Sequence, residues 1–213
     1  MKRAVVLAGV LAAGLFALAE APRGISEGTR VPNEMQMGVT FGFYAPQGYF
    51  GSLQARDEVE AMARAGVTWV TVVPMVWQEA SDASLQYKDF ERSQNDLDLA
   101  DIIAFIHAKG MKVQLRPMLE CKDGVGRLGV LIPDDRTRMG IARSRRSAWF
   151  RSMAARSAYY ARIAERTKCE VYCLDSEFDR MIDENEKWKA VVAAVRQVYS
   201  GPVTSCHSVH CNV

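Results

Sequence analysis

The sequence predicts an α/β fold with parallel strands, organised as about five strand–helix units of an incomplete (β/α)8 TIM barrel. Three observations predict it. Short apolar, β-branched segments alternate with longer segments of helical apolar spacing, which is typical of βαβ units. Glycines separate helix from strand at Gly66, Gly110 and Gly201. Polar and aromatic residues follow the strands at the ends where such barrels carry their active sites.

The first unit opens with a strand over residues 36–44. A loop follows, and Ser52 is expected to cap a helix that ends at Gly66. The next strand, residues 67–76, is nearly all apolar and β-branched, as in a strand buried on both faces. The predicted apolar stripe of the helix is Leu53, Val59, Met62 and Ala63.

The remaining units repeat this order. Asn95 or Asp96 caps a helix with apolar Leu99, Ile102, Ile103 and Ile106, and Gly110 ends it. The other expected segments are a strand at 111–119, a long loop at 120–144, a helix at 148–166, a strand at 170–175, a helix at 184–199 and a strand at 203–206.

These units fit an open doubly wound sheet or part of a closed barrel. No glycine-rich phosphate motif follows the first strand, which favours the barrel. A complete barrel takes about 250 residues, so about three units are expected to be missing.

The N-terminus predicts export. Lys2 and Arg3 precede an apolar stretch ending in small residues, which is typical of a secretory signal peptide over residues 1–19. The alternative is a membrane anchor, but roughly 16 apolar residues fall short of the ~20 that span a bilayer. Residues 20–36 are expected to form a linker and 37–213 a single soluble domain. The protein is therefore expected to be secreted or periplasmic, with no membrane contact after cleavage.

Charge and cysteine content argue against a nucleic-acid partner, a metal site and an extensive set of disulfides. The formal net charge is +2 and charged residues make up 24% of the chain, so nothing indicates a nucleic-acid partner. The arginines between Arg136 and Arg156 are expected to form a solvated helix face. Five cysteines allow at most two disulfides, and Cys173 is expected to be a buried thiol. No cofactor or metal is predicted: the cluster Cys206-His207 to His210-Cys211 does not match zinc-ligand spacing, and the two cysteines are alternatively a disulfide.

The sharpest candidate for chemistry is the end of the fourth strand, where Asp175 and Glu177 follow an apolar run. Strand periodicity would place both carboxylates on one face, where repulsion and burial raise the pKa of one of them, as a general acid requires. The alternative is that this segment simply begins a solvated loop.

The order of motifs resembles glycoside hydrolase family 113 from Met37 to about Cys206. The matching segments are Met37 to Pro46 with Gly48-Tyr49, Glu60 to Pro74, Gly110 to Pro117, the strand into Ser176-Glu177, and Trp188 to Thr204.

The resemblance implies a retaining barrel glycosidase active on β-1,4-mannans. Its acid/base glutamate, at the end of strand four, matches Glu177. Its nucleophile, at the end of strand seven, has no counterpart in this sequence, so catalysis by this chain alone is expected to be impaired. The Trp-Arg-Gly element of the loop after strand three is reduced to Gly126-Arg127-Leu128-Gly129, which weakens the expectation of sugar contacts there.

The expected partner is a polysaccharide or oligosaccharide. Arg116 is expected to donate hydrogen bonds to hydroxyls or to a catalytic carboxylate. A non-catalytic carbohydrate-binding protein is the alternative function, and open sheet edges also predict self-association. Trp77 is expected to stack on a sugar ring or, alternatively, to be a packing residue at the rim. The predicted substrate-binding residues are Tyr44, Trp77, Arg116, Asp175 and His207.

Overall fold

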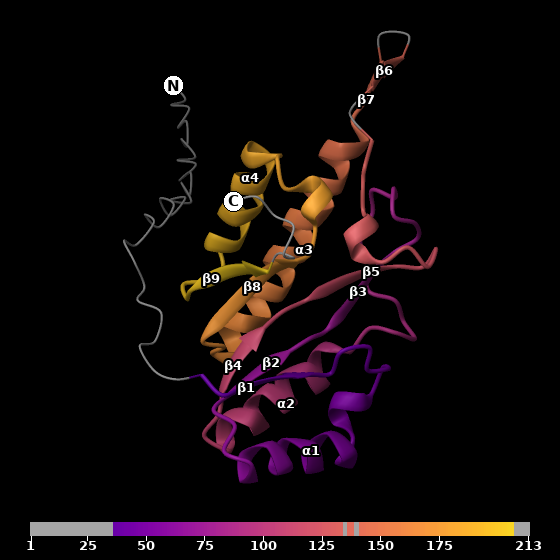
Figure 1. Ribbon diagram of the computed structural model, residues 1–213. Coiled ribbons are helices and arrows are strands. Elements are labelled where there is room, and N and C mark those ends of the chain that lie inside the picture. Colours follow the sequence, from indigo (N-terminus) through magenta and orange to yellow (C-terminus); the bar gives the residue numbers. More distant parts are fainter. Residues whose placement is uncertain (1–35, 134–135, 139–140, 207–213) are drawn as a thin grey trace, which may run out of the picture.

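The computed structural model describes residues 36–133, 136–138 and 141–206. Its central feature is a five-stranded parallel sheet with the strand order β1-β2-β4-β8-β9 (Figure 1). Each strand lies beside the strand of the next unit, which confirms the predicted α/β fold with successive parallel crossovers. The strands are β1 (Gly38–Phe41), β2 (Trp69–Val72), β4 (Lys112–Leu115), β8 (Val171–Ser176) and β9 (Val203–Cys206).

Two of the expected strands are interrupted by proline. The segments predicted as continuous strands at 67–76 and 111–119 each form two strands, and β2 and β4 continue beyond Pro74 and Pro117 as β3 (Met75–Gln78) and β5 (Met118–Cys121). Proline has no N–H to donate to the ladder, so the main sheet stops there. The two continuations pair with each other in parallel, and Trp77 of β3 also forms an isolated antiparallel bridge with Tyr87.

Four helices pack on one face of the sheet: α1 (Leu53–Arg64), α2 (Asp96–Ala108), α3 (Arg145–Thr167) and α4 (Asn185–Arg196). Val70, Val113 and Tyr172 point toward them and belong to the same core cluster as their apolar residues. The alternate residues face the other side, where the Thr71 hydroxyl donates to the Gln114 side chain over 2.9 Å. The described part is therefore the wall of a barrel with helices outside.

The helix starts follow the predicted capping. The Ser52 hydroxyl accepts from the Ala55 N–H at 3.1 Å, and Asn95 caps α2 by accepting from Asp98 at 2.8 Å. The four predicted apolar positions of α2 are fully buried. Leu53 was wrongly assigned to the α1 stripe, because it is 80% exposed whereas Ala55 and Val59 are fully buried. Residues 55, 59, 62 and 63 follow helical spacing, and Leu53 falls outside that face.

The loop expected at 120–144 contains structure of its own. It holds a short 3₁₀ helix, η2 (Arg127–Gly129), and an antiparallel hairpin of β6 (Arg136–Arg138) and β7 (Ile141–Arg143) that projects from the rest of the chain (Figure 1). The helix α3 follows directly and starts earlier than expected.

The basic segment is not uniformly solvated, contrary to the prediction. Arg156 is only 7% exposed, and Arg146 binds Glu184 on the segment before α4 at 2.6 Å. These arginines therefore contribute to packing between segments, as long side chains with apolar stems often do.

Both β1 and β9 are sheet edges within the described residues. The predicted self-association through open edges therefore stays a prediction. In this part of the chain no helix has the length and apolar character needed to cross a membrane. The four described cysteines are free thiols, and Cys173 is buried as predicted, whereas Cys211 lies outside the described residues.

Candidate active site

Glu177 lies on the turn that follows the fourth strand of the sheet. Strand β8 ends at Ser176, and Glu177 has a φ of 62°, a left-handed conformation uncommon for a residue other than glycine. Its N–H donates to the carbonyl of Cys206 over 2.8 Å. Strand alternation thus stops before Glu177, and the predicted spacing does not by itself place it on the face of Asp175. The side chain of Asp175 lies outside what the structure describes.

Arg127 joins two carboxylates at this end of the sheet. Its Nη1 binds Oε1 of Glu120 at 2.5 Å, and its Nη2 binds Oε2 of Glu177 at 2.7 Å. Glu120 belongs to β5 and is only 6% exposed. One guanidinium from η2 therefore fixes the end of the third unit to the end of the fourth through charge-assisted hydrogen bonds.

Two aromatic rings from the turn after β1 lie next to this cluster. The Arg127 guanidinium sits over the Phe43 ring at 5.5 Å, and the Phe43 and Tyr44 ring centroids are 4.2 Å apart. Both rings are substantially exposed, Tyr44 by 53%. Burial and the neighbouring Glu120 carboxylate raise the pKa of the Tyr44 hydroxyl. Tyr44 therefore stands beside Glu120 and Arg127 and presents an open ring face to solvent.

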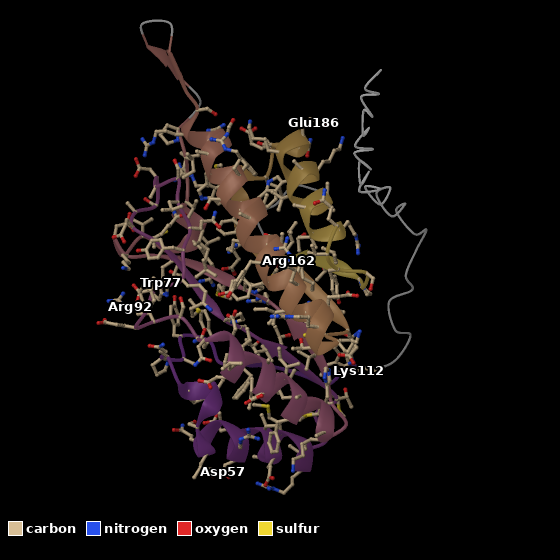
Figure 2. All side chains as sticks on the ribbon, turned by 180° about the vertical axis from the view of Figure 1, so that it is seen from behind. Asp57, Trp77, Arg92, Lys112, Arg162 and Glu186 are labelled. Carbon is tan, nitrogen blue, oxygen red and sulfur yellow. The ribbon has the colours of Figure 1, made fainter. Side chains whose placement is uncertain are left out.

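Trp77 is buried in β3 and pairs in register with Glu120. It is 8% exposed and packs with Met75 and Met118, while Arg92 covers its ring at 5.2 Å (Figure 2). Its Nε1 has no hydrogen-bond partner in the described part of the chain. Sugar stacking on Trp77 would require Arg92 to move aside.

Arg116 lies at the end of β9, whose last residue, Cys206, also accepts the hydrogen bond from the Glu177 N–H. The Nη1 of Arg116 is 3.8 Å from the Cys206 sulfur. A catalytic carboxylate was one of the two partners expected for Arg116, but Arg116 binds none in the described residues. Glu120 and Glu177 pair with Arg127 instead. His207 lies outside the described residues.

Two residues of this cluster were absent from the predicted site. Glu120 had the right position after a strand, but its spacing gave no reason to join it to Glu177. Arg127 carried a weak signal, as the arginine that remains of the Trp-Arg-Gly element in Gly126-Arg127-Leu128-Gly129.

The cluster provides the components of acid–base chemistry. Burial alone would lower the pKa of Arg127, but the hydrogen bond to Glu120 and the charge of Glu177 raise it, so the guanidinium stays charged. Oε1 of Glu177 makes no hydrogen bond within the described residues. In the same part of the chain, no three His, Cys, Asp or Glu residues gather as metal ligands.

Replacing Arg127 with methionine is expected to lower the free energy of unfolding by about 3 kcal/mol, because the buried Glu120 loses its counter-charge. Urea unfolding of wild type and Arg127→Met measures it. Arg145→Met is the matched control: it breaks a surface pair with Asp82 at 3.0 Å and should cost about 0–1 kcal/mol. The double variant, with Glu120→Gln added to Arg127→Met, should regain part of the lost free energy of unfolding because it no longer buries an unpaired carboxylate at position 120. Equal costs for the two single variants would contradict the bridging role.

Comparison with known proteins identifies the family. The model of Glycoside Hydrolase Family 113 matches residues 39–211. The chain belongs to glycoside hydrolase family 113. A comparison with curated proteins finds no match.

This chain is similar to β-mannanases of family 113 whose structures have been solved. One, a β-1,4-mannanase solved as a complex, has 26% identity and a TM-score of 0.76, over 83% of this chain and 57% of that one. The β-mannanase AaManA from Alicyclobacillus acidocaldarius, in complex with ManMIm, has 29% identity and a TM-score of 0.74, over 80% and 53%. A further β-1,4-mannanase has 28% identity and the same TM-score, with 55% of its length matched. The chain thus spans little more than half the length of these relatives.

Proposed function

We propose that this chain carries the acid/base half of a retaining glycosidase site for β-1,4-linked mannan-type saccharides. The observation that carries the proposal is the position of Glu177, just past the fourth strand, held at one oxygen by Arg127 and with the other oxygen unoccupied in the described residues. The matching relatives are β-mannanases, which supports a mannan-type substrate.

In the proposed reaction Glu177 first acts as general acid. Its Oε1 delivers a proton to the glycosidic oxygen as the C1–O bond breaks and a carboxylate attacks C1 from the opposite face. Glu177 then takes a proton from the water that hydrolyses the glycosyl-enzyme, which returns both carboxyl groups to their starting state.

The attacking carboxylate belongs, by family resemblance, to the end of strand seven. That strand is not among residues 36–206, where the sheet runs from the first strand to the fifth. A retaining pair requires carboxyl groups about 5–5.5 Å apart. Completion of the site by a strand-seven glutamate is therefore part of the proposal.

Phe43 and Tyr44 supply the proposed sugar platform. Their exposed rings stand beside the Arg127–Glu177 pair, and a flat ring covers the apolar face of a pyranose well. Hydroxyls of the bound sugar would meet the polar atoms of Arg127, Glu120 and the Tyr44 hydroxyl.

A second candidate function is carbohydrate binding without cleavage. Arg127 occupies Oε2 of Glu177 and Oε1 of Glu120, so neither carboxylate is fully free for proton transfer. The same three side chains could hydrogen-bond sugar hydroxyls without cleaving the glycosidic bond.

Titration of the protein with mannopentaose separates these functions. Tryptophan fluorescence reports binding, and proton NMR of the same samples reports products and their anomeric form. The titration uses protein that includes the proposed strand-seven carboxylate, and we expect binding together with product that first appears as the β-anomer. Binding without product would support the second candidate, and α-anomer released first would contradict the retaining mechanism. Neither binding nor product, under conditions where the protein is folded by circular dichroism, would contradict both functions.

We also propose that the protein is exported. The support is the basic start and apolar stretch of residues 1–19, which have the composition of a signal peptide. The N-terminal sequence of protein recovered outside the cytoplasm tests this: we expect it to begin after Ala19, and an intact Met1 would contradict cleavage.

A further inference from the structure

A groove on the helix side of the sheet is separate from the carboxylate cluster. It lies between residues 84–88, called here the strap, and helix α3, and has a volume of about 660 Å³, within the usual range of small-ligand sites. Val76 lines it and belongs to the core cluster shared with the helices. Its neighbour Trp77 packs in the other cluster, because successive strand residues face opposite sides. The groove therefore opens on the outer side of the barrel wall.

The strap is firmly attached, so the groove is preformed. The N–H of Gln86 donates to the Ser152 hydroxyl of α3 over 2.8 Å, and Tyr87 exchanges two backbone hydrogen bonds of 2.9 Å with Trp77. At one end Lys88 binds Asp96 at 2.6 Å. Tyr159 donates to the same carboxylate, and burial with this hydrogen bond raises the pKa of its hydroxyl. Preformed walls lower the ordering cost of binding a ligand.

The lining favours a flat, largely apolar ligand. Leu85 from the strap and the rings of Tyr87, Tyr159 and Tyr160 surround the space. Leu85 is 67% exposed, which is high for a large apolar side chain that stands at a cavity. Tyr160 is only 1% exposed, whereas Tyr87 and Tyr159 are partly exposed. Lys122 and Lys88 lie over these two rings at 5.1 and 5.5 Å, and the remaining surface of both rings can contact another ring.

Charge in the groove selects an anion. Its lining residues include Lys88, Arg151 and Arg156 but no carboxylate. Lys88 is neutralised by Asp96. Arg151 is exposed and makes no hydrogen bond or ion pair within the part of the chain that the structure describes. Its guanidinium is thus available at the groove for a carboxylate.

An unpartnered amide marks the inner wall. Gln86 is 7% exposed, and neither its side-chain oxygen nor its nitrogen has a hydrogen-bond partner in the described residues. Buried amide groups are nearly always partnered, because leaving one unpaired costs about 1–3 kcal/mol. A ligand hydroxyl reaching Gln86 would supply the missing partner.

From these features we propose that the strap groove binds a small aromatic carboxylate. The ring lies between Leu85 and the tyrosines, the carboxylate pairs with Arg151, and a hydroxyl at the far end of the ring meets the Gln86 amide. The site does not depend on the glycosidase function, because its lining shares no residue with the Glu120–Arg127–Glu177 cluster.

Calorimetric titration with 4-hydroxycinnamate tests the proposal on the whole protein. We expect saturable binding that mannopentaose does not displace. Arg151→Gln should weaken it about tenfold, the loss of one charge-assisted hydrogen bond. Arg162→Gln is the matched control and should bind as wild type, since Arg162 lies three turns further along α3, outside the groove (Figure 2).

Two further comparisons test the contact of the carboxylate with Arg151 and that of the hydroxyl with Gln86. Uncharged 4-hydroxycinnamyl alcohol should bind about as weakly to wild type as the acid does to Arg151→Gln. Gln86→Leu, which removes an unpartnered buried amide and is expected to fold, should bind cinnamate and 4-hydroxycinnamate equally, whereas wild type prefers the hydroxylated acid. No heat at millimolar ligand, equal affinity for acid and alcohol, or equal weakening by the Arg151 and Arg162 variants would overturn the proposal.

Discussion

In protein that includes the proposed strand-seven carboxylate, replacing Glu177 with glutamine is expected to lower the rate of mannopentaose hydrolysis by about 10²–10⁴-fold, the usual contribution of a positioned general acid. Glutamine has the same shape but cannot donate a proton to the leaving oxygen. Its amide oxygen can still accept the hydrogen bond from Arg127 that Oε2 of Glu177 accepts, so the turn after β8 should keep its position. The dissociation constant of mannopentaose should therefore change little, and the loss should appear in kcat.

A change of leaving group shows whether the lost function is proton donation. A dinitrophenyl mannoside has a leaving group that departs without a proton, so its first step should be far less sensitive to Glu177→Gln than that of mannopentaose. Glu120→Gln is the matched control, because it removes the other carboxylate held by Arg127. An equal loss with both substrates, or a larger loss for Glu120→Gln, would contradict the acid/base role of Glu177.

Replacing Trp149 with alanine is expected to lower the free energy of unfolding by about 3–5 kcal/mol, as for other large buried aromatic residues. Trp149 is fully buried, and its ring meets Phe150 and Phe178 edge to face, at 5.0 and 5.4 Å. Its Nε1 donates to the buried Gln78 side chain over 3.1 Å. The variant loses apolar burial, leaves a cavity and removes the hydrogen-bond donor of the Gln78 side-chain oxygen.

Urea unfolding followed by far-ultraviolet circular dichroism measures this loss. Trp188→Ala removes a neighbouring tryptophan that is only half-buried, so its cost should be smaller. Trp149→Phe keeps most of the ring and should fall between wild type and Trp149→Ala. Because Phe178 follows Glu177, Trp149→Ala should also weaken mannopentaose binding. A Trp149→Ala cost no greater than that of Trp188→Ala would show that this cluster does not anchor the turn.

Elements with strong local patterns could be predicted closely. The α2 cap at Asn95, its buried isoleucines and the last strand at 203–206 agree with the sequence, because capping and periodicity act over a few residues. The breaks at Pro74 and Pro117 were missed, since the apolar runs around them outweighed the missing N–H of proline. Leu53 was misassigned because its apolar character suggested burial, although its position on the helix faces solvent.

The candidate site also combines a feature that the sequence predicted with contacts that it did not predict. A carboxylate directly after a buried strand was visible in the sequence, and family resemblance gave Glu177 its expected role. Its pairing with Arg127 and the approach of Glu120 were not visible, because they depend on how a loop between two strands folds back over the sheet.

The sequence by itself determined the order of the strand–helix units, most of the buried helix faces and the place of Glu177 at a strand end. These follow from local rules of spacing, capping and burial. Only the tertiary structure decided that Arg127 pairs with both Glu177 and Glu120, and that the strap encloses a groove against α3. Such pairings join residues that are distant in the chain, and they depend on backbone turns such as the left-handed φ at Glu177, which no residue pattern specifies.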